Sequence, residues 1–513
     1  MVRIRAHSQP LIVFVVVLAV LNPSCSSVAP SVTTHITFIE NVTLISPERD
    51  APLEEADVVI QDGRIAQVGE NLRPAAGAQR LDGRGRYLIP GLIDSHVHAG
   101  HPVALDDDVI DKRPELLAAY RAHVPRAYLA FGFTTVLDVD PTPEELAWFD
   151  RTPLHPRLYH CGRAVRVAGG YGAQRIPPSL AEKDFPSLVY EPSQAERWPA
   201  TLDHERHSPA RIVQRAAEEG GACVKVFVER GFGVFDWPVP QPDTLDALRA
   251  EATRRGLKLA VHATSVESWR AALNAHADVI AHGLWHWPGP RLNSAAPGEA
   301  RAVIEAAARA GVRVQPTLRV LQSDRSIFDS TLLDDPRLAW SLPEEILAYL
   351  RTPEAQSVRR TMADAYEQAA RSVGETSGAA ALIAVAIERA KATTRLMVEA
   401  QVPLIFGSDT PSGEGLGNPP GLNGRLELQE WSEAGISLIR ILRAATLDNA
   451  VAFGLERELG SIEVGKRADL VLLTANPLQS VGAYDAIETV LLNGEPIARE
   501  SMRPAHSPDG KGR

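Results

Sequence analysis

The sequence predicts an α/β fold: a (β/α)8 barrel, the TIM-barrel architecture, with a small β-sandwich domain built from both ends of the chain. From about residue 89 to 452, short apolar runs alternate with longer helical patterns, which is typical of βα units around a parallel sheet. Both flanks of this region instead alternate apolar and polar residues between hairpin turns. The length of 513 residues suits one barrel and a lesser domain.

Eight apolar runs in the central region are predicted to be the barrel strands. Loops that follow barrel strands project onto the catalytic face, so insertions there are expected to cover the site. Two such insertions are present, a segment rich in Pro, Arg and Glu at 167–207 and a mostly helical one at 323–395. The predicted strands are Gly91–Asp94, Thr134–Leu137, Arg157–Tyr159, Val224–Phe227, Lys258–Val261, Val279–Ala281, Val312–Gln315 and Leu404–Gly407.

The two flanks, residues 31–88 and 453–502, are predicted to form one β domain together. Val58 to Ile60 is a strand-like run followed by the turn residues Asp62 and Gly63, and similar runs return near the end of the chain. Residues 503–513 are predicted to be a disordered tail.

The first thirty residues are predicted to be an export signal. Arg3 and Arg5 give a basic start, and Leu11 to Leu21 is an apolar run too short for a membrane-spanning helix. Cys25 after Ser24 resembles a bacterial lipoprotein cleavage site, so a lipid on this residue is one alternative. The protein is therefore expected to be exported, either periplasmic or anchored to the envelope by that lipid.

Composition and charge exclude some classes of partner. Hydrophobic residues make up 45% and charged residues 23%, as in ordinary globular proteins. A net charge of −11 argues against nucleic acid, whose binders usually show a basic surface. Cys161 and Cys223 remain once the signal is removed, and the sequence leaves open whether they pair. Cys223 is predicted to be a buried core thiol.

Two patterns point to a metal centre in the barrel. His96 and His98 lie two residues apart at a strand end, so both imidazoles are on one side of the strand and can point at one ion. Lys225 lies inside an apolar strand, where a charged ammonium is costly unless it is neutralised or paired. A lysine at the rim of the barrel is the simpler alternative for Lys225 alone.

Three further candidates end later strands. His262 and His282 close consecutive apolar runs, and Asp409 closes the last one. Because parallel barrel strands all end on the same face, these side chains are expected to converge with His96 and His98.

The order His-x-His, Lys, His, His, Asp, together with Pro90 to Ser95 before the first pair, resembles the metal motifs of the amidohydrolase superfamily. The resemblance extends over nearly the whole mature chain, including residues 442–450 and 460–470. The nearest branch holds imidazolonepropionase-like enzymes and binuclear dipeptidases that act before proline, and Lys225 favours the binuclear members.

The resemblance implies a metal-dependent amidohydrolase that cleaves a C–N bond of a small-molecule substrate through a hydroxide bridging two divalent ions. Zn²⁺ is the first expectation, and Mn²⁺, Co²⁺ or Fe²⁺ are alternatives. His96, His98 and Asp409 would hold one ion, His262 and His282 the other, with carbamylated Lys225 between them. Asp409 would accept the proton of the hydroxide and pass it to the leaving nitrogen.

Three residues are candidates for substrate contact. Tyr171 stands where many relatives have histidine, and Thr264 where several have tyrosine or histidine, which argues against assuming a dipeptide substrate. His286, between two tryptophans after the sixth strand, is a candidate for lining the pocket.

Other functions remain as alternatives. The same centre suits a lactone, ester or phosphoester hydrolase. A deaminase ranks lower, because that class commonly has glutamate where this chain has Ser265. A metal-free binding protein on the same fold would be expected to have lost ligands, and all the expected ones are present. The sequence leaves open whether the chain forms a homo-oligomer.

Overall fold

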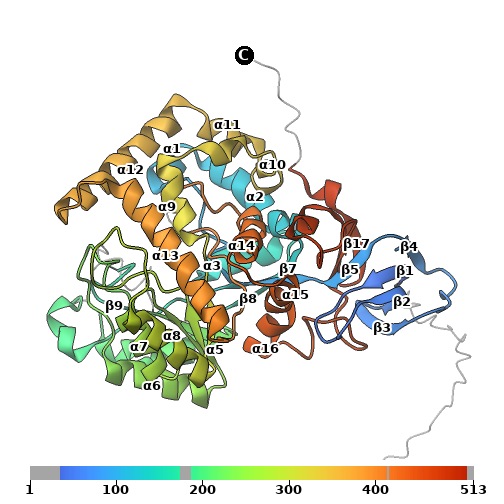
Figure 1. The fold of residues 1–513 in the computed structure, drawn as a ribbon, viewed down its shortest axis with the longest axis horizontal. Helices are drawn as coiled ribbons and strands as arrows, with labels where there is room; N and C mark the ends of the chain where they lie inside the picture. Colours follow the sequence, from blue (N-terminus) through green and yellow to red (C-terminus); the bar gives the residue numbers. More distant parts are fainter. Residues whose placement is uncertain (1–34, 174–186, 201, 413–414, 505–513) are drawn as a thin grey trace, which may run out of the picture. The chain divides into compact units, whose positions relative to one another are not determined.

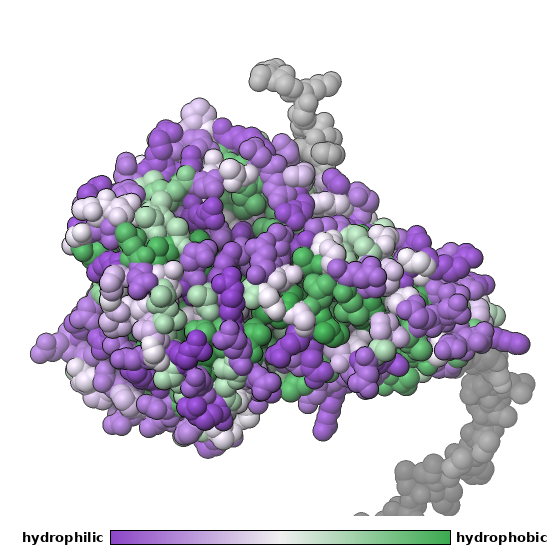
Figure 2. Space-filling view, viewed as in Figure 1, coloured by the Kyte–Doolittle hydropathy of each residue, from purple (hydrophilic) through white to green (hydrophobic). Residues whose placement is uncertain are grey.

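The computed structural model describes residues 35–173, 187–200, 202–412 and 415–504 (Figure 1). The predicted export signal, Cys25 and nearly all of the predicted tail lie outside these residues. Within them, no helix combines the length and the hydropathy needed to cross a membrane. The face drawn in Figure 2 is largely hydrophilic with apolar areas between, as is usual for the surface of a globular protein.

Seven barrel strands form two parallel sheets, in agreement with the sequence-based prediction. Most of their residues are buried, although those of β8 are only half-buried, because helices cover one side and the barrel interior the other. The first sheet contains β6 (Leu92–Val97), β7 (Phe133–Asp138) and β8 (Arg157–His160), and the second contains β11 (Cys223–Phe227), β12 (Lys258–His262), β13 (Val279–Ala281) and β14 (Arg313–Gln315).

Isolated bridges join the two sheets into a ring. One isolated bridge joins Val165, which follows β8, to Val226 of β11. A second joins Val314 of β14 to Leu404. Residues 404–406 therefore occupy the eighth strand position, and the backbone N–H of Ser95 donates to the carbonyl oxygen of Phe406 at 3.2 Å to close the ring. The fold is a (β/α)8 barrel, as predicted.

The barrel helices follow their strands with ordinary helix-start chemistry. One example positions a candidate ligand: α7 (Val266–Asn274) begins directly after β12, with Ser265 and Ser268 forming a capping box. The indole N–H of the fully buried Trp269 donates to the carbonyl oxygen of Ala263 at 3.1 Å. This contact fixes the chain just after His262. The other helices along the barrel are α1 (Asp107–Lys112), α2 (Pro114–Ala130), α3 (Pro143–Arg151), α5 (Pro209–Glu218), α6 (Pro242–Arg254), α8 (Gly298–Ala310), α14 (Leu422–Glu433), α15 (Leu438–Arg443) and α16 (Asn449–Ala452).

Both ends of the described chain share one sheet, which confirms the predicted β domain. β15 pairs antiparallel with β5, so the C-terminal strands join the N-terminal ones. The order is β17-β16-β15-β5-β1-β2-β3, with β4 paired to β1. The strands are β1 (Ile36–Leu44), β2 (Leu53–Gln61), β3 (Arg64–Gly69), β4 (Gln79–Asp82), β5 (Tyr87–Pro90), β15 (Leu470–Leu473), β16 (Ile487–Leu492) and β17 (Glu495–Ala498).

Gly91 connects this sheet to the first barrel strand. A Cβ added there would lie 1.9 Å from the Thr134 hydroxyl oxygen, so only glycine fits between β5 and β7. This tight passage leads directly into β6 and its two histidines.

The predicted helical insertion contains five helices. They are α9 (Val320–Phe328), α10 (Leu338–Ser341), α11 (Glu344–Leu350), α12 (Pro353–Ser372) and α13 (Ala379–Glu399). The described parts of the segment 167–207 contain the end of β9 (Arg166–Val167), β10 (Leu188–Val189) and two 3-10 turns.

The structure pairs Cys161 with Cys223 in a disulfide. Both residues are buried in a cluster with Leu137, Ala260 and Ile405. The expectation of a buried thiol at Cys223 is thus right about burial and wrong about the thiol. Residues 62 positions apart meet here because β8 and β11 are neighbours in the ring, which pairwise sequence spacing does not reveal.

We expect the double substitution Cys161→Ala/Cys223→Ala to lower the free energy of unfolding by about 4 kcal/mol, since the bridge closes a long loop in the unfolded chain. Chemical denaturation with and without reductant measures this. Each single variant should behave like the double one. Equal stability of the wild type in both conditions, with two reactive thiols after denaturation, would show that the bridge does not form.

Candidate metal centre

All six predicted ligands lie together at the carboxyl ends of the barrel strands. Five are buried, and the side chain of His98 is 23% exposed. His96 and the neighbouring His98 come from the end of β6, Lys225 from β11, His262 from β12, and His282 directly follows β13. Asp409 follows the eighth strand segment, and its backbone N–H donates a hydrogen bond to the carbonyl oxygen of His96 at 2.8 Å.

The carboxylate of Asp409 is the point on which the imidazoles converge. Its Oδ1 lies 3.0 Å from His98 Nε2 and 3.4 Å from His96 Nε2, and its Oδ2 lies 3.7 Å from His282 Nδ1. Ligand atoms of His96, His282 and Asp409 all lie within 4.8 Å of one another, a spacing that suits one cation. His262 adjoins this group, with its ring 4.4 Å from that of His282.

Lys225 lies inside the same cluster. Its Nζ is 3.4 Å from His96 Nε2, and the side chain is 1% exposed. Burial lowers the pKa of Lys225 to about 7, so much of the lysine is a neutral amine near neutral pH. The simpler alternative, a lysine reaching the rim of the barrel, is therefore not what the structure shows.

Among the buried side-chain atoms that lack a hydrogen-bond partner within the described chain, two belong to predicted ligands. They are Asp409 Oδ1 and His262 Nε2. Asp409 Oδ1 lies 3.0 Å from His98 Nε2 as a close ion-pair contact, and it still has lone-pair capacity for a cation. Buried polar atoms without partners are rare in proteins, and nitrogen and carboxylate oxygen are donors that Zn²⁺ accepts. The residues present therefore fit a divalent metal ion.

Neighbouring side chains orient the histidines. His96 Nδ1 lies 3.1 Å from Gln315 Oε1, and His282 Nδ1 lies 2.9 Å from Thr317 Oγ1. Engaging Nδ1 in this way leaves Nε2 for an ion, which is the usual arrangement behind metal-binding histidines.

The charge states and backbone conformations of these candidate ligands also suit metal binding. Burial and the nearby Lys225 keep the pKa of His96 well below its ordinary value, so the imidazole is neutral, as metal binding requires. Burial alone would raise the pKa of Asp409, but the surrounding imidazoles hold it well below its ordinary value. His282 and Asp409 have positive φ of 81° and 56°, an uncommon conformation for such residues that recurs at functional sites.

Sequence reasoning missed Glu229, which is 3% exposed and lies beside His262. Its Oε1 accepts hydrogen bonds from the backbone N–H groups of Gly231 (2.7 Å) and Phe232 (2.8 Å). Its Oε2 accepts from the Thr264 hydroxyl at 2.5 Å and lies 3.4 Å from His262 Nε2. Although burial acts to raise it, contact with His262 lowers the pKa of Glu229 to about 2. Its position just after a barrel strand was the sequence signal that could have identified Glu229 as a site residue.

The three predicted substrate contacts gather around His262. The ring of Tyr171 stacks on that of His262 at 5.3 Å and also contacts Trp237. His286 Nδ1 lies 3.0 Å from Thr264 Oγ1, and Thr264 itself is fully buried. Contact of these residues with substrate stays a prediction.

Replacing Glu229 by glutamine should weaken binding of a metal ion at His262 by about 10- to 100-fold, the usual cost of losing an outer carboxylate partner. Competition with a chromophoric chelator measures the affinity. Asp236→Asn is the matched control, because Asp236 is in the same loop but its side chain is 84% exposed. Equal affinities in the wild type and both variants would mean that Glu229 does not support His262.

Comparison with known proteins links this geometry to a family. The model of the amidohydrolase family matches residues 87–497, which include β5, the whole barrel and most of the C-terminal strands.

Individual relatives are more distant. A dihydroorotase from Trichlorobacter lovleyi is 38% identical over 80 residues, which are 16% of this chain and 16% of that protein. Among solved structures, a molinate hydrolase has a TM-score of 0.64 and 20% identity, covering 94% of this chain and 99% of its own. A prolidase complexed with N-methylphosphonate-L-proline has a TM-score of 0.62 and 23% identity, covering 90% of this chain and 100% of its own. At these identities the structures show a shared fold.

Proposed function

Because the chain belongs to the amidohydrolase family, we propose that it is a metal-dependent hydrolase that cleaves a carbon–nitrogen bond of an amide-type small molecule. The observation that carries this proposal is the convergence of four imidazoles, three of them buried, with the buried Lys225 and Asp409; Asp409 Oδ1 and His262 Nε2 have no hydrogen-bond partner in the described chain.

The ligands divide into two groups around Lys225. His96, His98 and Asp409 would hold one ion, and His262 and His282 the other. Lys225 would bridge them as a carbamate, which its largely neutral amine favours because only an uncharged amine reacts with carbon dioxide. Bound divalent ions would lower the pKa of water towards neutrality, supplying a hydroxide nucleophile, and would polarise the substrate carbonyl.

Asp409 would move the proton. Its low pKa keeps it ionised and able to accept a proton from the attacking water, and its Oδ1 is free of hydrogen bonds to other described residues. It would then donate this proton to the leaving nitrogen, so that an amine and not an amide anion departs. The aromatic side chains around His262 would exclude water from that side of the site.

A substrate panel tests the proposal. Purified protein loaded with Zn²⁺, Mn²⁺, Co²⁺ or Fe²⁺ is assayed on N-acyl amino acids, proline dipeptides, cyclic amides, lactones and phosphoesters, and again after chelation. We expect metal-dependent cleavage of an amide-type compound. Preferential cleavage of lactones or phosphoesters would move the proposal to the alternative hydrolase classes. Hydrolysis that survives complete metal removal would overturn it.

We also propose that the protein is exported, through residues 1–30. The Cys161–Cys223 disulfide supports this, because such bonds persist in oxidising compartments such as the periplasm. Fractionation of expressing cells, with mass measurement of the N-terminus, tests both export and a lipid on Cys25. Recovery of uncleaved protein from the cytoplasm would contradict export.

A further inference from the structure

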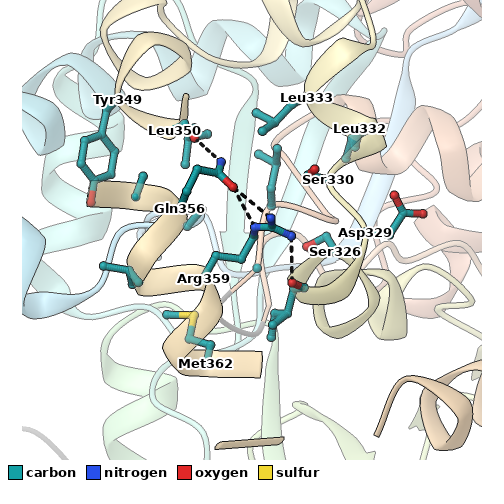
Figure 3. Close-up of a pocket in the computed structure, with 16 residues that line it drawn as sticks. Ser326, Asp329, Ser330, Leu332, Leu333, Tyr349, Leu350, Gln356, Arg359 and Met362 are labelled. Atoms are coloured by element: carbon teal, nitrogen blue, oxygen red, sulfur yellow. Dashed lines mark hydrogen bonds between the residues drawn. The ribbon is translucent and has the colours of Figure 1, made fainter. Parts of the chain in front are cut away.

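The insertion after β14 forms a partly open cavity of about 60 Å³ between α9, α11 and α12 (Figure 3). Ala104 and the segment Gly415–Leu416 complete its lining. Its lining includes neither the six candidate metal ligands nor Tyr171, Thr264 and His286. The cavity is therefore a feature separate from the centre described above.

Its walls come from segments that follow the metal-centre strands. Ala104 is six residues after His98, so their Cα atoms are at most about 21 Å apart. α9 begins three residues after Thr317, whose hydroxyl contacts His282. The cavity thus lies on the catalytic face and within a limited distance of the metal centre.

The wall next to Asp409 is held firmly on α9. The N–H of Gly415 donates to the Ser323 hydroxyl at 3.1 Å, and that hydroxyl donates to the carbonyl of Gly415 at 3.2 Å. A Cβ on Gly417 would lie 1.8 Å from the carbonyl oxygen of Gln322, so the two backbones are in close contact. Asn418 Nδ2 in turn donates to the carbonyl of Asp409 at 3.3 Å. The cavity is preformed and connected to a candidate catalytic residue.

Most of the lining is apolar, and the space is small. A cavity of about 60 Å³ has room for roughly four to six water-sized groups. Such a space favours a short aliphatic or small aromatic group over water. Residues that make it apolar include Ile327, Leu332, Leu333, Leu350, Met362 and Leu416.

One cation lines this apolar space. The guanidinium of Arg359 donates to Gln356 Oε1 from Nε (3.1 Å) and Nη2 (2.9 Å), and to the carbonyl of Ile327 from Nη1 (3.1 Å). These bonds use three of its five N–H groups, and both acceptors are neutral. Figure 3 shows the carboxylate of Asp329 pointing away from this guanidinium, and Asp329 lies 3.9 Å from Arg325 instead. Within the described chain, no carboxylate is within 4 Å of Arg359.

We propose that this cavity binds the apolar body of a small organic acid, with its carboxylate held by Arg359. This inference is independent of the proposed function, because none of the candidate metal ligands lines the cavity. A guanidinium with free N–H groups matches a carboxylate, and its low-dielectric surroundings strengthen that bond.

Calorimetry with hexanoate, using the metal-loaded full chain, tests the binding. We expect hexanoate to bind more tightly than hexanamide or acetate, which lack the charge and the apolar body respectively. Arg359→Gln should weaken hexanoate binding by about 10- to 100-fold, as expected for a lost hydrogen bond to a charged group. Met362→Trp should weaken both hexanoate and hexanamide by filling the cavity. The exposed neighbour Arg360 provides the control, since Arg360→Gln should leave binding unchanged.

The outcomes separate this inference from the proposed function. Hexanoate binding that is insensitive to Arg359→Gln and disappears on chelation would place the acid on the metal ions and overturn the inference. Arg359-dependent binding without hydrolysis of any amide would retain the cavity and reject the function. If Met362→Trp does not fold, as shown by its melting curve, Leu333→Phe tests the filling instead.

Discussion

Lys225→Ala should abolish turnover and remove much of the bound metal. Lys225 Nζ lies in the middle of the cluster, 3.4 Å from His96 Nε2, so truncation leaves a gap between the two ligand groups. Metal ions contribute several kcal/mol of transition-state stabilisation, and each 1.36 kcal/mol is tenfold in rate, so we expect a loss on the order of 10³-fold or more. Elemental analysis and assays on one preparation measure both effects.

Chemical rescue distinguishes a bridging role from a structural one. Acetate or propionate should partly restore metal and activity in Lys225→Ala, because a small carboxylate can occupy the gap. Lys225→Arg should not be rescued, since guanidinium keeps its charge and forms no carbamate. Lys258→Ala is the matched control, because Lys258 is at the opposite end of β12 and more than a third exposed. Near-normal metal and turnover in Lys225→Ala would require a one-metal scheme.

Asp409→Asn should retain appreciable metal and lose turnover. The amide still offers an oxygen to an ion but cannot carry a proton, and the loss of general acid–base catalysis costs about 10²- to 10⁴-fold in kcat. Metal content and kcat measured together test this separation.

Asp278→Asn serves as the control, because Asp278 is a half-buried carboxylate of the same barrel. Asp278 precedes β13 at the opposite end of the barrel, where it accepts from the backbone N–H of Leu259 at 2.8 Å. That change should affect stability and leave kcat nearly intact. Equal losses of metal and turnover in Asp409→Asn would mean that Asp409 acts as a ligand only.

The barrel and the placement of the candidate ligands were predictable because both follow from local pattern. A buried parallel strand is a continuous apolar run, and its last residue lies on the catalytic face. His262 and Asp409 could therefore be recognised from their positions at the ends of apolar runs. The eighth strand was the hardest to recognise, since residues 404–406 join the ring through one isolated bridge and backbone hydrogen bonds.

Other features depend on contacts that no local pattern encodes. Cys161 and Cys223 pair because two strands are neighbours in the closed ring. The carboxylate of Glu229 accepts hydrogen bonds from Gly231 and Phe232 and so stabilises the turn that follows it. This turn holds Glu229 beside His262. Arg359 lines a cavity because three separate segments pack around it.

Anomalous X-ray diffraction from crystals of the metal-loaded protein, recorded at the absorption edge of that metal, tests the central claim most directly. We predict two peaks in each chain, one among His96, His98 and Asp409 and one between His262 and His282. Electron density should continue from Lys225 Nζ to a group that contacts both peaks. A single peak, or two peaks with an unmodified Lys225 that touches neither, would contradict the binuclear account.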